Sequence, residues 1–363
     1  RETKSSGLIH SGLYNSTSEV NDLNEFNMGE KITKELNPVY GSIQALKTRD
    51  TDVVVFTEDK VLKVLASKDA VYNADGNPQL VATNRTLGQT TPFVGDYGIS
   101  KNPESLTWDQ YRLYFTDMQR GAVLRLSRDG LTPISNVGMK TWFRDNLKNC
   151  NTALGTFDKI NGEYNLTLKD GSIEDTTVSF NEGSKGWVSF KSFIPQAGLS
   201  VSNKYITAKD NNVYEHYKDI IDEDPDSFYS GKVINRNTFY PPKLLPDDDG
   251  ATPYYSIENL APYFTESSVD ILFNDNPGSV KSFQTMNYEG SQARVNKFTI
   301  ENVTDASGAP VVSIGQEGDE EYYNLKSKFG WYVNSFNTDM QEGKVPEFIN
   351  KENKWFNKII GVK

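Results

Sequence analysis

The strand signal along this chain comes in pairs of alternating segments joined by short polar turns. Residues 52–67 form the first pair, which turns at Glu58–Lys60. Residues 110–135 form a second pair of alternating segments joined by a polar turn. A period of two sets apolar side chains on one face of each strand, namely Tyr111, Leu113 and Phe115 on the first and Ala122, Leu124 and Leu126 on the second. Each pair predicts an antiparallel hairpin.

Further strands follow with the same spacing. Residues 162–180 form a pair with Asp170–Gly171 as the turn signal, residues 185–194 form a single strand, and residues 203–217 turn at Asp210–Asn212. The likeness of "FTEDKVLKV" to "FTDMQRGAVLRL" indicates an internal repeat. Small meanders cannot bury their faces alone, so neighbours must stack. We therefore expect a mainly β fold, a β-propeller-like array of antiparallel meanders.

Few helices are predicted beside these strands. Residues 138–148 have the pattern of a short amphipathic helix, and residues 24–42 can hold another that ends before Pro38. Residues 66–105 and 136–156 otherwise have the character of long loops. Apolar residues near the end of the chain recur at roughly helical spacing and predict a C-terminal amphipathic helix: Phe348, Ile349, Trp355, Phe356, Ile359 and Ile360.

Composition shifts divide the chain into four expected parts. Residues 1–50 form an N-terminal extended or helical segment that leads into the first blade, and residues 51–218 form the blades. Residues 219–255 are rich in Asp and Pro and are expected to be a linker or surface loop. Residues 256–363 add further strands and the C-terminal helix. Because the chain begins with Arg1, we expect it to be a processed product or a segment of a longer chain.

Charge and cysteine content exclude several classes of protein. The formal net charge of the 363 residues is −11, with no basic arm or stripe, which argues against specific binding of nucleic acid through its phosphates. A single cysteine allows neither an intrachain disulfide nor a cysteine-based zinc site. No apolar segment approaches the ~20 residues of a membrane span. The aromatic content of 12% suits packed strands.

Residues for acid–base or nucleophilic catalysis are scarce. The two histidines, His10 and His216, stand in a loose N-terminal segment and on a predicted strand, without the neighbours of a catalytic triad. Cys150 has no histidine nearby and is interpreted as an incidental or buried thiol. Nucleotide-binding glycine motifs are absent. We predict no catalytic and no cofactor-binding residues.

An acidic stretch resembles part of a calcium loop. Asp222, Asp224 and Asp226 have the 1-3-5 spacing, but Ser227 and Val233 stand where such a loop needs Gly and Glu. A solvated acidic loop is the favoured interpretation, and Asp247–Asp249 is treated in the same way. We predict no metal site.

Charged and aromatic residues on the predicted hairpins can serve as contact points. Arg120, Arg125 and Arg128 are expected to contact another blade or another subunit, because Arg125 points away from the face of Leu124 and Leu126. Turn capping is the favoured role for Asp117 and Asp129 over a place in an active-site loop. Two tryptophans are candidates for stacking on glycans: Trp187 and Trp331.

The segment "YGISKNPESLTWDQYRLYFTDMQRGAVLRLSRDGLTPISNVGMKTWFRDNL" (97–147) resembles virion structural proteins of tailed bacteriophages, especially of the marine cyanophage type. Supporting stretches are "YGSIQAL", "VYNADGNPQLVATN", "GWVSFKSFIP", "NYEGSQARV" and "EFINKENKWFNKI". The architecture is similar to the propeller-bearing nozzle or muzzle proteins that finish short tails. The resemblance implies a virion component without catalysis. Such proteins are usually longer, so we expect this chain to be the C-terminal part of a bigger polypeptide.

We therefore expect a non-enzymatic structural protein in the tail or neck of a phage. Its expected partners are other tail, neck and portal-proximal subunits and further copies of itself in a symmetric ring, whose acidic wall lets DNA pass without binding it. One alternative is a tail-associated receptor- or glycan-binding protein. Another is a polysaccharide depolymerase that uses paired carboxylates.

Overall fold

The chain divides into two compact units, Arg1–Ser268 and Val269–Lys363. The computed structural model describes residues 3–49, 52–72, 78–171, 174–223, 225, 230–231, 233, 238–241, 263, 265–273, 278–279, 281, 283–290, 303–304, 310–311, 322–323, 331–337, 342–343 and 347–358. Both units are built mainly from antiparallel β-strands.

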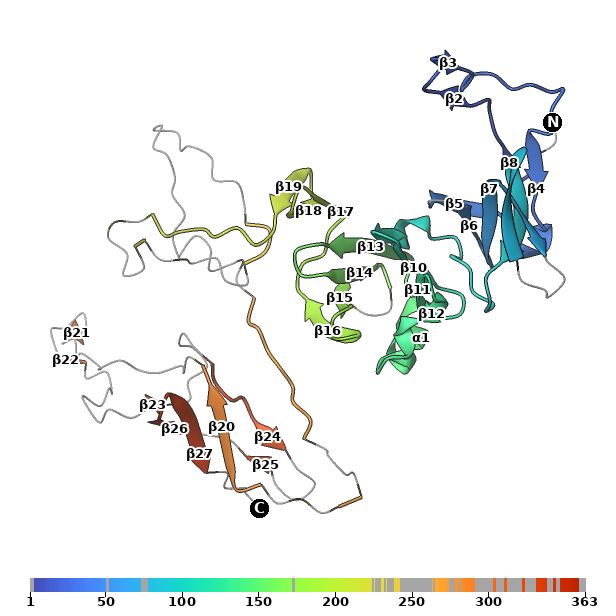
Figure 1. Ribbon diagram of the computed structural model, residues 1–363. Coiled ribbons are helices and arrows are strands. Elements are labelled where there is room, and N and C mark those ends of the chain that lie inside the picture. Colours follow the sequence, from blue (N-terminus) through green and yellow to red (C-terminus); the bar gives the residue numbers. More distant parts are fainter. Residues whose placement is uncertain are drawn as a thin grey trace. The chain divides into compact units, whose positions relative to one another are not determined.

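The first unit contains four antiparallel meanders that follow one another along the chain (Figure 1). Sheet 1 contains β5 (Ile43–Thr48), β6 (Asp52–Thr57), β7 (Val61–Tyr72) and β8 (Pro78–Pro92). Sheet 2 contains β9 (Thr107–Asp109), β10 (Arg112–Asp117), β11 (Ala122–Ser127) and β12 (Gly130–Pro133). Sheet 3 contains β13 (Thr152–Asp158), β14 (Glu163–Lys169), β15 (Thr176–Asn181) and β16 (Gly186–Lys191). Sheet 4 contains β17 (Ala197–Val201), β18 (Lys204–Lys209) and β19 (Asn212–Glu215).

Sheet 2 lies between sheets 1 and 3 because both of its faces are apolar. Leu113, Phe115, Leu124 and Leu126 turn one way and pack against Val54, Phe56 and Val61 of sheet 1. Tyr114 and Val123 turn the other way and pack against sheet 3, where Phe157, Tyr164 and Leu166 lie. Alternate residues of a strand point to opposite faces, so one hairpin supplies the core on both sides. The pairing of Phe115 with Leu124 keeps these two faces in register.

Successive sheets approach each other closely at glycines. A Cβ on Gly155 of β13 would lie 2.0 Å from the carbonyl oxygen of Ser105, which belongs to the 3₁₀ helix η2 (Pro103–Ser105). Gly121, in the turn between β10 and β11, has φ +65° and would place a Cβ 2.6 Å from the Cα of Arg144. Arg144 belongs to α1 (Lys140–Leu147), which buries Phe143 and Leu147 against sheets 2 and 3. Only glycine fits such approaches without displacing the neighbour.

The second strand of each sheet carries the same pair of residues, an apolar side chain followed by threonine: Phe56–Thr57, Phe115–Thr116, Leu166–Thr167 and Ile206–Thr207. All four threonines are completely buried. The first strands are also neighbours, since β13 contacts both β9 and β17. The four sheets are thus repeats of one structural unit that stack in chain order.

Residues before sheet 1 cover its outer face. β1 (Gly7–Ile9) pairs with β4 (Thr33–Glu35), and β2 (Tyr14–Asn15) pairs with β3 (Val20–Asn21). Leu36 packs against Val55, Leu62 and Val64 of sheet 1. The predicted helix before Pro38 is wrong, because residues 33–35 pair as a strand and only the 3₁₀ helix η1 (Pro38–Tyr40) is helical there.

In the second unit, strands are short and one sheet has the order β20–β27–β26–β23. It contains β20 (Thr285–Glu289), β23 (Tyr322–Tyr323), β26 (Glu347–Lys351) and β27 (Lys354–Lys358). Phe348 and Trp355 form its buried centre, and the Trp355 indole donates to the carbonyl oxygen of Gly290 at 2.7 Å. Two further strand pairs are β21 (Val303–Thr304) with β22 (Pro310–Val311), and β24 (Phe336–Asn337) with β25 (Glu342–Gly343).

The predicted C-terminal helix is also wrong. Residues 347–358 form the β26–β27 hairpin, which turns at Glu352 and Asn353 with φ of 52° and 62°. Two successive residues with positive φ make the tight turn that matches the twist of paired strands. Pairing of β27 with β20 then fixes the strand conformation. Ile359 and Ile360 lie outside the described residues.

The remaining expectations have mixed outcomes. The mainly β fold of antiparallel meanders is confirmed, as is the helix within 138–148. Within the predicted loop 66–105, however, β7 and β8 pair as far as Tyr72 and Pro78. No closed propeller is formed by the residues that the structure describes. Residues 219–255 lie largely outside them, so the linker stays a prediction.

The interface between sheets 1 and 2 generates a stability prediction. The Phe115 ring is completely buried and meets the Phe56 ring edge-on, with 5.0 Å between centroids. Phe115→Ala leaves a cavity in this core and should lower the free energy of unfolding by about 3–5 kcal/mol, measured by urea denaturation. The control Val94→Ala, at a side chain that is 92% exposed, should change it little. Equal effects of the two substitutions would contradict this packing.

Candidate functional site

Charged residues at the β10–β11 turn add polar contacts to the apolar core between sheets 1 and 2. Asp117 is completely buried and accepts hydrogen bonds from the Gly98 backbone N–H at 3.1 Å and the Ser100 hydroxyl at 3.1 Å. Arg120 donates to Asp117 at 3.0 Å and to Asp59, in the β6–β7 turn of sheet 1, at 3.2 Å. A buried carboxylate needs several donors to offset its lost hydration, and these supply them. Asp117 thus joins the turn of sheet 2 to the loop that follows sheet 1.

Arg125 lies on the opposite face of sheet 2, beside its cross-strand partner Tyr114. Its Nη1 donates to Glu182, in the β15–β16 turn of sheet 3, at 2.9 Å, and the Tyr114 hydroxyl donates to the same carboxylate at 2.7 Å. Arg112 is 3.7 Å away from it. The Glu182 carboxylate therefore contacts two arginines and one tyrosine hydroxyl of sheet 2. These contacts connect sheet 2 to sheet 3.

An aromatic stack continues this contact into the core. The Tyr114 ring lies nearly parallel to those of Tyr164 and Phe157, with centroids 4.9 and 5.6 Å away. Burial, together with the hydrogen bond to Glu182, raises the pKa of Tyr114, so the phenol stays protonated and remains a donor. The stack is rigid and holds the Glu182 cluster in position.

The interface between sheets 3 and 4 is more polar. The Tyr205 hydroxyl lies 2.9 Å from Thr156 Oγ1 and 3.2 Å from the Asn165 amide nitrogen. The Tyr217 hydroxyl donates to buried Asp158 at 2.7 Å. His216 packs beside Tyr205, and its Nε2 lies 2.8 Å from Thr207 Oγ1. Burial lowers the pKa of His216 to about 4, so the imidazole is neutral at physiological pH.

The other predicted contact residues lie apart from these clusters. The Arg128 guanidinium sits over the Tyr111 ring, 4.9 Å from its centroid. The Trp187 ring is half-buried against Phe143 and Phe180, and its indole donates to the carbonyl oxygen of Ile134 at 3.1 Å. Trp331, in the second unit, is 46% exposed. Trp187 therefore serves core packing, whereas Trp331 keeps an accessible ring.

The residues considered for catalysis or metal binding are dispersed. The His10 ring makes a local contact, in which Nδ1–H donates to the carbonyl oxygen of Ser11 at 2.8 Å. Burial raises the pKa of the Cys150 thiol to about 11, which makes it a poor nucleophile. Asp222 is buried, and Asp224, Asp226 and 247–249 lie outside the described residues. Across the described part of the chain, His, Cys, Asp and Glu form no cluster of three that could hold a metal ion.

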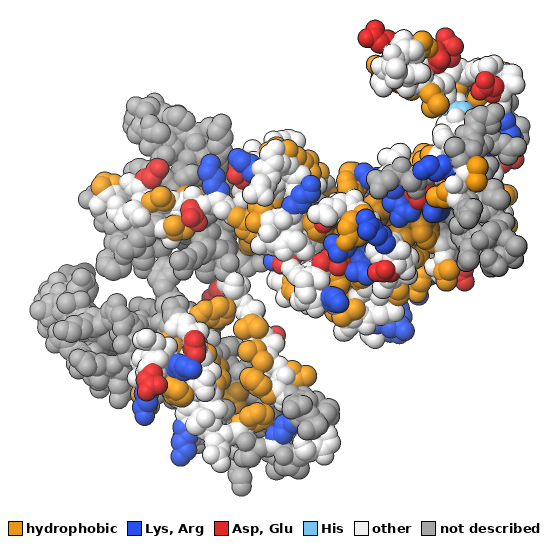
Figure 2. Space-filling model, viewed as in Figure 1, with side chains coloured by type: hydrophobic (Ala, Val, Ile, Leu, Met, Phe, Trp, Pro, Cys, Tyr) orange, Lys and Arg blue, Asp and Glu red, His pale blue; other side chains and the backbone are white. Residues whose placement is uncertain are grey.

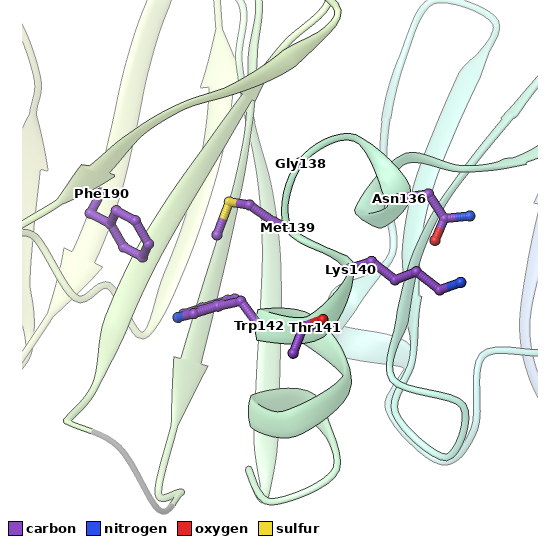
Figure 3. Close-up of a pocket in the computed structure, with 7 residues that line it drawn as sticks. All are labelled: Asn136, Gly138, Met139, Lys140, Thr141, Trp142 and Phe190. Carbon is purple, nitrogen blue, oxygen red and sulfur yellow. The ribbon is translucent and has the colours of Figure 1, made fainter. Parts of the chain in front are cut away.

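A surface cavity of about 670 Å³ lies beside the start of α1 (Figure 3). Trp142 and Met139 reach into it from the helix and the residue before it, Phe190 faces them from β16, and Asn136 and Lys140 extend on the other side. The sequence did not single out this site, nor Asp59 and Glu182. Their partners are distant in sequence, and no local pattern marks them.

Comparison with known proteins shows that the stacked sheets are similar to one protein family. Residues 32–211 match the family model of the Crassvirus muzzle protein. The match begins just before β4 and ends in the turn after β18, so it spans sheets 1 to 3 and most of sheet 4. No curated protein matches the chain. The match supports a structural protein of a phage virion, and the described helices include none that is long and apolar enough to cross a membrane.

The Glu182 cluster generates a second stability prediction. Glu182→Ala leaves Arg125, Arg112 and Tyr114 without their shared acceptor and should lower the free energy of unfolding by about 2–3 kcal/mol in urea denaturation. The matched control is Asp145→Ala, which removes an ion pair whose side chains are 56% exposed. The control should cost less than about 0.5 kcal/mol. A loss no larger than that of the control would contradict the role of Glu182.

The pKa of His216 generates a third prediction. The unfolded chain binds a proton at His216 near pH 6.5, whereas the folded chain does so only near pH 4. Folding stability is therefore complete above pH 6.5 and falls as the pH drops towards 4, by roughly 2–3 kcal/mol from this group. His216→Gln should remove this part of the slope. Carboxylates titrate in both proteins, so the difference between their stability curves isolates His216, and parallel curves would contradict the assignment.

Proposed function

We propose that this chain is a non-enzymatic structural component of a phage tail, of the muzzle or nozzle type, and that sheets 1 to 4 are consecutive blades of a β-propeller. The observation that carries the proposal is that the muzzle-family match coincides with the four stacked meanders. A tail protein of this kind works mechanically, as a rigid body with surfaces for its neighbours.

Features of the stack support the propeller. Each sheet repeats the apolar–threonine pair in its second strand, and first strands contact one another as they do around a propeller axis. The face of sheet 4 that turns away from sheet 3 exposes apolar side chains, with Leu199 at 54%, Val201 at 49% and Val213 at 73%, beside the Lys204–Glu215 ion pair. In a propeller, such a face is covered by the next blade. Exposure of this face therefore fits a stack that continues beyond sheet 4.

Rigidity follows from the contacts between sheets. Asp117 and Arg120 join sheet 2 to sheet 1, and Glu182 joins sheet 3 to sheet 2, each at a turn outside the apolar core. Apolar burial supplies most of the stability, whereas the ion pairs fix the lateral position of one sheet on the next. A body locked in this way resists shear, which suits a component through which the genome leaves the particle.

Assembly and DNA passage complete the proposal. Identical subunits form a closed ring through heterologous contacts, in which different surfaces of neighbouring copies meet. A net charge of −11 disfavours tight contact with DNA phosphates and lets DNA slide past the wall. On the face shown in Figure 2, Lys and Arg side chains gather over the middle of the first unit, with Asp and Glu beside them. The partly buried ion pairs of Arg112, Arg120 and Arg125 neutralise part of this positive charge within the fold.

A depolymerase is less well supported. Hydrolysis of a glycosidic bond needs two carboxylates across an open cleft. The cavity beside α1 is lined by no carboxylate, and neither is the cavity of about 450 Å³ between β1, β5 and β9. A receptor-binding role is favoured by a separate observation, the aromatic side chains of Trp142 and Phe190 at the cavity beside α1.

Electron microscopy of purified virions tests the proposal. Antibody against the recombinant chain should label the end of the tail, and the symmetric density there should accommodate several copies of the stacked sheets. Label over the capsid would contradict the tail position. Absence of the chain from virions by mass spectrometry would refute the structural role altogether.

A further inference from the structure

The cavity beside α1 is built around Trp142, which packs against the core between sheets 2 and 3 and stays only partly buried. Phe143 and Leu147, four residues apart on the helix, fill the space between sheets 2 and 3. Trp142 lies on the flank of the helix, only partly buried, with its ring edge-on to Phe143 at 4.9 Å and 89° and to Phe190 at 5.5 Å and 74°. Two such contacts hold the indole in one orientation, so its accessible face is preorganised.

Phe190 completes the aromatic surface from a different sheet. It lies on β16, the last strand of sheet 3, and is 57% exposed. Trp187 on the same strand turns into the core. In Figure 3, the Met139 side chain and the Trp142 ring point towards the Phe190 side of the cavity. Aromatic rings from two elements, α1 and β16, thus meet at one cavity and remain accessible to solvent. Nothing in the packing of the fold requires these rings to be accessible.

Polar groups surround this aromatic surface. Asn136, Lys140 and Thr141 line the same cavity and are exposed, so an amide, an ammonium and a hydroxyl are available to a ligand. A cavity of about 670 Å³ with aromatic walls and a polar margin matches a molecule that has an apolar face and many hydroxyls. A pyranose ring has this chemistry, because its C–H face stacks on an aromatic ring while its hydroxyls exchange hydrogen bonds.

We propose that the cavity lined by Met139, Trp142 and Phe190 binds an oligosaccharide, with one sugar ring on the aromatic surface and the next directed towards Asn136 and Lys140. The absence of a carboxylate from the seven lining residues makes this a site for binding without hydrolysis. The inference does not depend on the position of the chain in the virion. If the tail position holds, the ligand is a glycan of the host surface.

A peptide added to the edge of β16 is the main competing ligand. Strand addition requires side-chain subsites along the whole edge. Of the β16 residues, only Phe190 lines the cavity. In the described part of every four-stranded meander of this stack, the last strand pairs with a neighbour on one side only. The unpaired outer edge of β16 is therefore no evidence for strand addition at this site. The site is compact and centred on rings, as a sugar subsite is.

Binding to an array of bacterial polysaccharide fragments, neutral and uronate-containing, tests the inference. The purified chain should bind at least one saccharide, and isothermal titration with that saccharide should show at least about tenfold weaker binding for Trp142→Ala and for Phe190→Ala. Phe190 is largely exposed, so its variant should keep the wild-type melting temperature even if the Trp142 variant is destabilised. Trp108→Ala, at an exposed tryptophan outside this cavity, should bind normally.

Three results would overturn the inference. The first is an array without any bound saccharide. The second is a bound saccharide whose affinity is unchanged in both variants. The third is a peptide array on which binding depends on Phe190 while no saccharide binds, which assigns the cavity to strand addition. None of these results bears on whether virions contain the chain, so the structural role is tested separately.

Discussion

The structure depends on the burial of both faces of sheet 2. In its central hairpin, Leu113 and Phe115 point to one face and Tyr114 points to the other, so both faces are apolar. Each face is shielded from water only when another sheet packs against it. Sheet 1 covers one face and sheet 3 the other. The stacked order follows from this requirement, because a short meander with two apolar faces is stable only between neighbours.

Charge is placed where the apolar core ends. Asp117 and Glu182 each sit at a turn, bind arginine from sheet 2, and take further hydrogen bonds that offset the loss of hydration. The last interface changes character, since Tyr205 contacts Thr156 and Tyr217 contacts Asp158 through hydrogen bonds, while His216 packs beside Tyr205 of sheet 4. Burial lowers the pKa of His216 beside this interface, so protonation of its imidazole in acid destabilises sheet 4.

The same stack positions the proposed saccharide site. The connection from sheet 2 to sheet 3 contains α1, whose inner face completes the core while its flank presents Trp142 beside Phe190. The scaffold therefore fixes the aromatic surface as firmly as it fixes the core. The muzzle-family match over residues 32–211 covers this helix together with the sheets on which it rests.

The alternating pattern by itself predicted the hairpins within 52–67, 110–135, 162–180 and 203–217, the mainly β class and a helix within 138–148, because period and turn residues act locally. It missed β13, which begins inside the predicted loop 136–156, and β17. The same local evidence failed at the C-terminus, where apolar residues at helical spacing form the β26–β27 hairpin, since Glu352 and Asn353 adopt the turn and β20 pairs with β27. It failed also for β8 and for the part of β7 beyond residue 67, whose polar residues give no period although their backbones pair. Only the tertiary structure decided that Arg125 meets Glu182, that Arg120 meets Asp59, and that Trp142 lies beside Phe190. These partners are separated by 57, 61 and 48 residues, and contacts over such distances follow from how the sheets stack, which no local pattern of residues encodes.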